Sequence, residues 1–379
     1  MKTPWRPPDG PGSTRRTFLG QLGRLSVGLV LWPVAAGCED HAFEPVIAGS
    51  DVPFLTPEDV FYRQFGANGA VEGWAGAPAL DASTWTMALE GLVERPMDLS
   101  IGELYADPPD TVLATLRCII NSNAIPGLVG TATWTGVPLR VFLERAGVNP
   151  ERARNLHVYG ADGFTDKLAL DKIYGARPED LPEPMLVYEM NGRPLSPAHG
   201  APVRLLVPGH FGFKSVKWIS RIEVTDRDER FGSYPSVLGY DEDGRIPVNA
   251  KVTSHLRNDR VPPGLVQITG YALSGQAGIA SVEVAVDEAP FRPARLLTLR
   301  EILATNPDVQ GCVQILQPER YGYPFPGVWV LWEYRWRATE GVHRLRIRAS
   351  DTLGNMQPET DTNPKDGENP VFEIEVQVG

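Results

Sequence analysis

The cysteine Cys118 is the residue whose type and position in this sequence best suit chemistry. It ends an alternating, β-rich stretch, residues 115–121 (TLRCIIN), and a segment rich in glycine and small residues, 127–132, follows. A thiol at the end of a strand, facing a loop whose backbone can approach a ligand closely, suits a soft metal ion. A buried cysteine without a chemical role is more common, because cysteine is among the most buried residue types. These residues alone leave both interpretations open.

The chain contains two other cysteines, and the sequence predicts a different role for each. Cys38 follows residues 34–37 (VAAG), which resemble a lipoprotein cleavage box with Cys38 as the acylated residue. Cys118 and Cys312 could form a disulfide in an oxidising compartment, but the apolar, strand-like run around Cys312 favours a core thiol. The sequence has no CxxCH motif and no zinc-type spacing, so we expect no haem attached to this chain.

The first 37 residues are typical of a targeting segment and are kept out of the fold prediction. Residues 13–19 (STRRTFL) resemble a twin-arginine export signal, and the apolar run 25–36 that follows is too short to span a bilayer. Twin-arginine export is associated with proteins that fold around a cofactor before they cross the membrane. We therefore expect a periplasmic or otherwise extracytoplasmic protein with a prosthetic group, attached to the membrane only if Cys38 is lipidated.

Composition narrows the class of protein. The 379 residues carry a net charge of −11, and 42% of them are hydrophobic, which is typical of an ordinary globular protein. Residues 1–37 carry a net charge of +4, so the remaining chain carries −15. An acidic body without a basic stripe argues against nucleic acid as a partner.

The elements that must position Cys118 fall into a sequence of segments. Residues 38–75 are predicted to be a loop-rich lead-in, and 76–225 combine strands with a few short helices, which indicates an α+β domain. Residues 226–260 are charged and turn-rich, and we expect a linker with loops there. Several alternating runs fill residues 261–379 and predict an all-β, immunoglobulin-like sandwich.

Within the α+β segment, a few local signals place individual elements. Ser100 is predicted to begin a short helix, and residues 139–147 form an amphipathic run. Asp162-Gly163 and Asn191-Gly192 are strong turn signals after strands, and the second pair is typical of a hairpin.

Taken in order, several stretches resemble the sulfite oxidase family of molybdopterin enzymes over nearly the whole chain after residue 37. They are residues 115–121, 134–139 (WTGVPL), 188–195 (YEMNGRPL), 199–208 (HGAPVRLLVP), 214–218 (KSVKW), 329–336 and 348–358. The resemblance implies a sulfite oxidase-like molybdopterin-binding domain followed by a dimerisation-type domain, and a cofactor of one molybdenum on molybdopterin. It also implies that the deprotonated thiol of Cys118 is the protein's ligand to the metal.

The same resemblance assigns residues to the phosphate of the pterin. A dianionic phosphate needs hydrogen-bond donors, and His199, Arg204 and Lys217 supply an imidazole, a planar fork and an ammonium within one stretch. The backbone amides of Ser215 and Val216 could add neutral donors.

Other positions match the family less directly. Tyr62 and Arg63 match a pair that contacts the cofactor in relatives, and Asp162 matches a position that hydrogen-bonds it, although Asp162 could equally serve only its turn. Asn121 and Tyr234 are candidates for lining the substrate face of the metal.

The sequence departs from sulfite-oxidising members next to the metal. Those members carry arginines directly after the cysteine motif to bind the oxyanion, and this chain has Ser122 and Asn123 there. The aromatic lead-in of residues 61–66 is more similar to periplasmic reductases that act on methionine sulfoxide. The substrate therefore stays open between a small oxyanion and an S- or N-oxide.

We expect an exported oxidoreductase that transfers an oxygen atom to or from a small substrate. Because no haem site is predicted, electrons would be exchanged with a separate cytochrome or membrane haem protein. A homodimer is implied by the resemblance, although Trp329, Trp332 and Trp336 could equally be sandwich core. The competing hypothesis is a cofactor-free binding lipoprotein on the same scaffold, which would have little reason to keep Cys118 and the phosphate-binding residues.

Overall fold

The computed structural model describes most of the chain after the predicted signal segment. The described residues are 52–63, 77–122, 127–254, 260–363 and 365–379. The predictions that concern the twin-arginine segment, Cys38, Asn123 and residues 64–66 lie outside these ranges. Among the described residues, no helix is long and apolar enough to cross a membrane.

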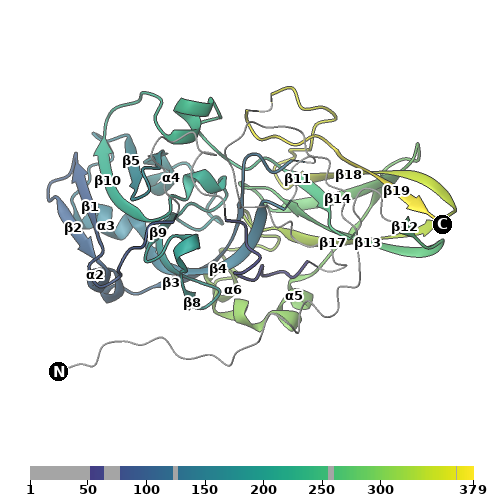
Figure 1. Ribbon diagram of the computed structural model, residues 1–379, viewed down its shortest axis with the longest axis horizontal. Coiled ribbons are helices and arrows are strands. Elements are labelled where there is room, and N and C mark those ends of the chain that lie inside the picture. The colour runs from purple at the N-terminus through teal and green to yellow at the C-terminus, as the bar shows by residue number, and fades with distance from the viewer. Residues whose placement is uncertain (1–51, 64–76, 123–126, 255–259, 364) are drawn as a thin grey trace. The chain divides into compact units, whose positions relative to one another are not determined.

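Two five-stranded sheets build the half of the fold that contains Cys118 (Figure 1). The first has the order β2-β1-β10-β5-β6 and consists of β1 (Thr86–Gly91), β2 (Met97–Ser100), β5 (Asn155–Gly160), β6 (Thr165–Ala169) and β10 (Ile219–Thr225). The second has the order β3-β4-β7-β8, with β9 also paired to β7, and consists of β3 (Asp110–Arg117), β4 (Val129–Pro138), β7 (Met185–Met190), β8 (Arg193–Pro194) and β9 (Arg204–Leu206). In the first sheet β1 and β10 are parallel, and the other pairs in both sheets are antiparallel.

The turns that the sequence predicted join neighbouring strands of these sheets. Asn191 and Gly192 both have positive φ angles, 50° and 69°, and they connect β7 to β8. Asparagine and glycine adopt this left-handed backbone at little cost, which makes the pair suited to a two-residue hairpin. Asp162 and Gly163 lie between β5 and β6, as expected.

The helices are short and lie between the strands. They are α2 (Ile101–Ala106), α3 (Leu139–Arg145), α4 (Asp171–Tyr174), α5 (Leu299–Thr305), α6 (Val313–Leu316), the 3-10 turns η1 (Pro197–His199), η2 (Gly212–Lys214) and η4 (Pro307–Gly311), and the π-helix η3 (Ser233–Leu238). The predicted helix start at Ser100 is confirmed, because Ser100 and Glu103 form a capping box that satisfies the first amides of α2. The amphipathic run after residue 138 forms α3 and buries Phe142.

Two further sheets form the C-terminal half. One has the order β11-β13-β17-β16 and consists of β11 (Asn249–Val252), β13 (Gly264–Leu273), β16 (Arg295–Leu296) and β17 (Val330–Ala338). The other has the order β12-β19-β18-β14-β15 and consists of β12 (Arg260–Val261), β14 (Ile279–Val286), β15 (Arg292–Pro293), β18 (Gly341–Asp351) and β19 (Phe372–Val378). Ile268 from the first sheet and Ile347 from the second belong to one buried cluster, so alternate residues of both sheets build a shared core. The immunoglobulin-like class of this two-sheet unit stays a prediction.

Two segments that the sequence predicted to be loops form regular secondary structure. Residues 130–132, expected in a loop, belong to β4 and pair with β3. Within the stretch 226–260, expected to be a linker with loops, the π-helix η3 and strand β11 form, and Tyr234 is buried. The reason is that this stretch also contains apolar side chains, which are buried in the cores of the neighbouring sheets.

The segment around Cys312 also differs from its prediction. Cys312 is buried, as expected of a core thiol, but it lies directly before the helix α6 instead of in a strand, and it forms no disulfide with Cys118. Residues 302–313 join the same apolar core as β3 and β4, and Gln314 hydrogen-bonds both backbone groups of Leu113. Part of the C-terminal half therefore packs against the sheet that carries Cys118.

Candidate functional site

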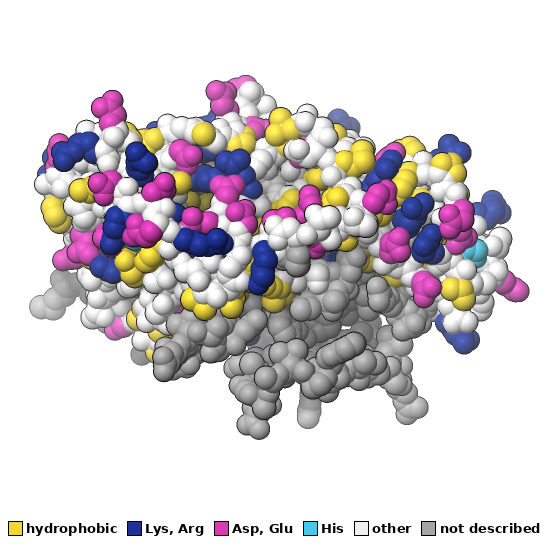
Figure 2. Space-filling view, turned by 90° about the horizontal axis from the view of Figure 1, so that it is seen from above, with side chains coloured by type: hydrophobic (Ala, Val, Ile, Leu, Met, Phe, Trp, Pro, Cys, Tyr) yellow, Lys and Arg dark blue, Asp and Glu magenta, His cyan; other side chains and the backbone are white. Residues whose placement is uncertain are grey.

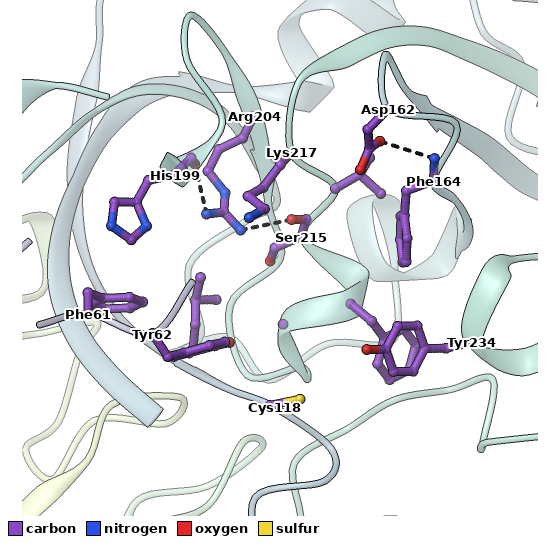
Figure 3. A pocket seen from close by; sticks show the side chains of 14 residues that line it. Phe61, Tyr62, Cys118, Asp162, Phe164, His199, Arg204, Ser215, Lys217 and Tyr234 are labelled. Carbon is purple, nitrogen blue, oxygen red and sulfur yellow. Dashed lines mark hydrogen bonds between the residues drawn. The ribbon is translucent and has the colours of Figure 1, made fainter. Parts of the chain in front are cut away.

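A buried pocket brings together residues from segments far apart in the sequence (Figure 3). It contains about 620 Å³ of space, including solvent at its mouth. Its lining residues are Phe61, Tyr62, Leu116, Cys118, Asp162, Phe164, His199, Arg204, Gly212, Phe213, Ser215, Val216, Lys217 and Tyr234. Cys118 lies on one side of the pocket, and His199, Arg204 and Lys217 lie on the other.

Cys118 is positioned by the end of β3. Its backbone amide donates a 2.9 Å hydrogen bond to Leu128 O, and its carbonyl accepts one of 3.0 Å from the amide of Asn121, which closes a turn. Because side chains alternate along a strand, Leu116 and Cys118 both reach the pocket. Burial raises the pKa of the Cys118 thiol to about 11, so its thiolate requires a cationic partner such as a metal ion.

Arg204, at the start of β9, is the centre of the cationic side. Its two terminal nitrogens donate to His199 O at 3.0 Å and to Ser215 O at 2.8 Å, and its guanidinium carbon lies 5.3 Å from the centre of the Trp134 ring. Nε of Arg204 is buried and has no hydrogen-bond partner among the described residues. Within the described part of the chain, the hydrogen-bond partners of the guanidinium are carbonyl oxygens, so its charge and one N–H suit an anionic ligand.

The ammonium of Lys217 and the imidazole of His199 are held beside Arg204. Nζ of Lys217 donates to Ala198 O at 3.0 Å, and Nε2 of His199 donates to Glu58 O at 3.1 Å. Gly200, with φ of 105°, allows this approach, because a Cβ there would lie 3.1 Å from the Cβ atoms of both Arg204 and Lys217. A side chain at position 200 would push the two cations apart.

The electrostatics of this side favour a bound anion. Burial lowers the pKa of His199 to about 3 and that of Arg204 to about 10, and burial also lowers the pKa of Lys217. The cause is desolvation of the charged forms, which a phosphate dianion would reverse. Three donors that line the same pocket therefore fit a phosphate group.

Aromatic side chains form the walls between the two sides. Phe61 stacks on Tyr62 at 5.4 Å and packs edge-on against His199 at 5.7 Å, whereas Phe213 and Tyr234 stack at 5.3 Å with nearly parallel rings. Burial raises the pKa of both Tyr62 and Tyr234. Their phenols therefore keep their protons and can donate hydrogen bonds into the pocket.

The π-helix η3 explains how Tyr234 reaches the pocket. π-helical turns are rare and occur frequently at functional sites. Gly232, with φ of 117°, precedes this helix, and a Cβ on it would lie 2.8 Å from Oδ1 of Asp166. The close approach of the Gly232 backbone to β6 brings Tyr234 against Phe164 and Phe213.

Most of the residues that the sequence singled out converge on this pocket. They are Tyr62, Cys118, Asp162, His199, Arg204, Ser215, Val216, Lys217 and Tyr234. Their role in holding a cofactor stays a prediction.

Two candidates are not part of the pocket lining, and a third contributes differently. Arg63 is exposed and donates to Asp59 O at 3.1 Å. Asn121 is fully buried outside the pocket, where its side chain donates to the hydroxyl of Tyr271 at 3.3 Å and accepts from the amide of Leu128. The backbone amide of Ser215 was expected to donate to the phosphate, but it already donates to Gly212 O at 3.1 Å. Ser215 therefore lines the pocket with its other atoms.

The sequence analysis did not name five lining residues as site residues: Phe61, Leu116, Phe164, Gly212 and Phe213. Phe164 follows the Asp162-Gly163 turn, and Phe213 precedes the KSVKW stretch, so proximity to those motifs was the available signal. Apolar and aromatic residues are common in any core, and their type alone does not mark a site.

The donor set fits a molybdopterin cofactor. A buried thiol can ligate a soft metal, and cations on the opposite side with an orphaned Nε of Arg204 can bind a phosphate. The aromatic walls between them suit a flat ring system.

Comparisons with known proteins agree with this site. The family model of the oxidoreductase molybdopterin binding domain matches residues 74–232. Nitrate reductase [NADH] 1 of Oryza sativa subsp. japonica is 28% identical over 358 residues, which cover 81% of this chain and 36% of the relative. Sulfite oxidase of Gallus gallus is 28% identical over 343 residues, covering 81% of this chain and 69% of the relative. The chain thus spans about a third of the length of the rice enzyme.

A solved structure shares the fold. The sulfane dehydrogenase SoxCD from Paracoccus pantotrophus superposes with a TM-score of 0.65 at 24% identity, covering 80% of this chain and 78% of that chain. The match extends beyond the domain model and includes much of the C-terminal half. Residues 74–232 thus match an oxidoreductase molybdopterin binding domain, and together with the sulfite oxidase relatives and this shared fold the match supports the sulfite oxidase family of molybdenum-dependent oxidoreductases.

Proposed function

We propose that this chain is an exported molybdopterin enzyme that transfers an oxygen atom to or from a small substrate. The observation that carries the proposal is the pocket itself, in which a thiol and a phosphate-type cation cluster face each other across aromatic walls. A cofactor with a metal at one end and a phosphate at the other matches this polarity.

The residues of the chain have separate tasks in this proposal. Cys118 would ligate the molybdenum, and Arg204, Lys217 and His199 would bind the terminal phosphate of the pterin. The carbonyl bonds of Arg204 hold its guanidinium plane in place before the cofactor binds, so little side-chain freedom is lost on binding. Binding of the anion would also favour the protonated imidazole of His199.

The bound molybdenum would supply the two-electron chemistry, and the protein would orient it and control access to it. The proton-bearing phenols of Tyr62 and Tyr234 lie in the pocket lining and can donate hydrogen bonds to oxygen atoms near the metal. Phe164 and Phe213 exclude water from the wall beside Tyr234.

The proposed substrate is a small oxyanion or an S- or N-oxide. Relatives named sulfite oxidase and nitrate reductase support an oxyanion. Sulfite itself is less well supported, because the partly buried Ser122 and the neighbouring Asn123 replace the arginines of sulfite-oxidising relatives. Spectroscopic titration of the centre with sulfite, nitrate, S-oxides and N-oxides would distinguish these substrates, and reaction with sulfite alone would contradict this interpretation of position 122.

The location and the electron partner belong to the proposal as well. Residues 13–19 support twin-arginine export to the periplasm, and Cys38 supports a lipid anchor. A cytochrome or a membrane haem protein would exchange electrons with the molybdenum. Cell fractionation of the wild-type chain and of a variant in which Arg15 and Arg16 are replaced by lysine tests the export route, and unchanged periplasmic location of the variant would contradict it.

A cofactor-free binding protein on the same scaffold is the competing function. The burial of Arg204 without a carboxylate partner among the described residues weighs against it, because an uncompensated buried charge is costly. Metal analysis separates the two functions directly.

The decisive experiment compares Cys118→Ser with Cys312→Ser in protein purified after export. Both cysteines are buried and neither forms a disulfide with the other, so Cys312→Ser is a matched control. Changing a residue that supports a metal ligand typically costs about 10–100-fold in affinity or activity, and loss of the ligand itself should cost at least that. We expect molybdenum in the wild type and the control, and a loss of activity by about two orders of magnitude or more in Cys118→Ser.

Absorption spectra provide the second measurement. The wild type and Cys312→Ser should show the visible band of a molybdenum–thiolate centre, and Cys118→Ser should lose it. Wild-type protein without molybdenum, or Cys118→Ser with unchanged metal, spectrum and activity, would contradict the proposal.

A further inference from the structure

Arg117, the residue directly before Cys118, is a fully buried cation that lies outside the pocket. Its side chain has an exposed fraction of 0%. Leu116 and Cys118 line the pocket and Arg117 does not, as the alternation of side chains along β3 requires. The guanidinium therefore lies on the opposite face of β3 from the pocket, where it contacts the backbone of Gly367.

The partners of this guanidinium are neutral. One terminal nitrogen donates to Gly367 O at 3.2 Å, and the other donates to Asn121 O at 2.9 Å and to Gly367 O at 3.3 Å. The guanidinium carbon lies 5.1 Å from the centre of the Phe211 ring. Nε has no hydrogen-bond partner, and no ion pair of Arg117 occurs among the described residues.

The charge is attached to the turn that carries the thiol. The amide of Asn121 donates to Cys118 O, which closes the turn of residues 118–121, and Arg117 bonds the carbonyl of the same Asn121. These backbone hydrogen bonds therefore fix the position of the guanidinium relative to the thiol. An uncompensated charge in a protein interior is destabilising unless an anion lies near it.

We propose that the charge of Arg117 compensates the anionic molybdenum–thiolate centre through Cys118 and raises the potential at which that centre is reduced. Arg117 is then a positioning and tuning residue, not a catalytic one. This inference rests on the proposed function, because it requires the metal to be bound at Cys118. A nearby positive charge in a low-dielectric interior stabilises the form of the centre that carries an additional electron.

The test is a spectroscopic redox titration of the purified molybdenum enzyme and three variants. Arg117→Gln removes the charge and keeps a hydrogen-bond donor, whereas Arg117→Lys keeps the charge and loses the fork. At a fixed potential near the wild-type midpoint, we expect Arg117→Gln to raise the ratio of oxidised to reduced centre at least tenfold. For a one-electron step this corresponds to about 59 mV. Arg117→Lys should stay within about threefold of the wild type.

Asn121→Asp makes the inference testable even if Arg117→Gln does not fold. Aspartate has nearly the shape of asparagine, and its carboxylate would accept from the Leu128 amide and from Tyr271, which already contact this side chain. The added negative charge beside Arg117 should also raise the proportion of oxidised centre. A titration of Asn121→Asp identical to that of the wild type would overturn the inference.

Two other outcomes would also overturn it. If Arg117→Gln and Arg117→Lys shifted the ratio equally, the hydrogen-bonding fork and not the charge would be responsible. If Arg117→Gln bound molybdenum normally and titrated like the wild type, the charge would have no effect. Metal analysis of the wild type keeps this result separate from the proposed function, which fails only if the wild type itself contains no molybdenum.

Discussion

At the scale of a single residue, Lys251 is a buried lysine whose amino group has no hydrogen-bond partner among the described residues. It lies in β11 opposite Tyr271 of β13, and only 4% of its surface is exposed. Burial holds the pKa of the Lys251 ammonium well below its usual value, and the charge of Arg117 lowers it further. Lys251 therefore weakens the fold in its present environment.

Replacing Lys251 by methionine should stabilise the protein. The unbranched side chain fills similar space without a polar group, which removes a desolvation cost of about 1–3 kcal/mol. Denaturant unfolding of the variant should show a higher free energy of unfolding than the wild type.

Lys214→Met is the matched comparison. Lys214 is also buried, but its Nζ lies 3.1 Å from Oδ2 of the buried Asp166 and donates to Lys167 O. Its removal leaves Asp166 without its cation and should cost about 3–5 kcal/mol. Equal effects of the two substitutions would show that the partner of a buried lysine does not determine its contribution here.

At the scale of the elements, the contact between β4 and β7 fixes the sheet that carries Cys118. Gly136 lies where the register between these strands shifts. A Cβ at Gly136 would lie 2.1 Å from Leu186 O and 2.6 Å from Cα of Val187. Because both atoms belong to the backbone, no side-chain rotation can relieve the overlap.

Gly136→Ala should therefore separate β4 from β7. Overpacking of this kind costs about 1–3 kcal/mol or more, and the midpoint of denaturant unfolding should fall accordingly. Gly102→Ala is the control, because Gly102 lies in α2 with Oγ of Ser100 at 3.9 Å as its nearest neighbour. Alanine in that helix should stabilise by up to about 1 kcal/mol. An unchanged Gly136→Ala variant would contradict the close approach of the two strands.

At the scale of the whole molecule, charges of both signs lie on the face drawn in Figure 2. Figure 2 shows Lys and Arg interspersed with Asp and Glu over the visible face, in keeping with an acidic chain of net charge −11. Two buried groups link stability to pH. Burial lowers the pKa of His210 to about 3, and burial raises the pKa of Asp166 to about 7.

These two groups act in opposite directions. The unfolded chain binds a proton at His210 more readily than the fold does, so this contribution is present above pH 6.5 and is lost as the pH falls toward 3. The fold binds a proton at Asp166 more readily, so that contribution is present below pH 3.8 and is lost as the pH rises through 7.

Substitutions at the two positions should change the pH dependence of stability with opposite signs. His210→Gln should reduce the loss of stability between pH 6 and pH 4 by up to about 1.4 kcal/mol per pH unit. Asp166→Asn should make that loss steeper, because it removes the opposing group. Free energies of unfolding measured across this range test both, and parallel curves for the wild type and His210→Gln would contradict the neutral, buried state of His210.

The sequence by itself determined the local features of the site. The alternating stretch before Cys118 predicts a strand that ends at the thiol, and β3 ends at Arg117. The Asn191-Gly192 hairpin and the helix start at Ser100 also follow from local chemistry. The grouping of His199, Arg204 and Lys217 around a phosphate followed from the resemblance of their stretches to the family, and the structure places all three at one pocket.

Only the tertiary structure decided which of these residues share a pocket. Asn121 and Arg63 are adjacent in sequence to pocket segments but lie outside the pocket, whereas Phe164 and Phe213 line it. Similarly, the hydrogen bonds of Gln314 to Leu113 join segments that are 201 residues apart. The direction of a side chain and the partner of a strand depend on contacts with distant segments, and those contacts are set by how the whole chain packs its apolar surface.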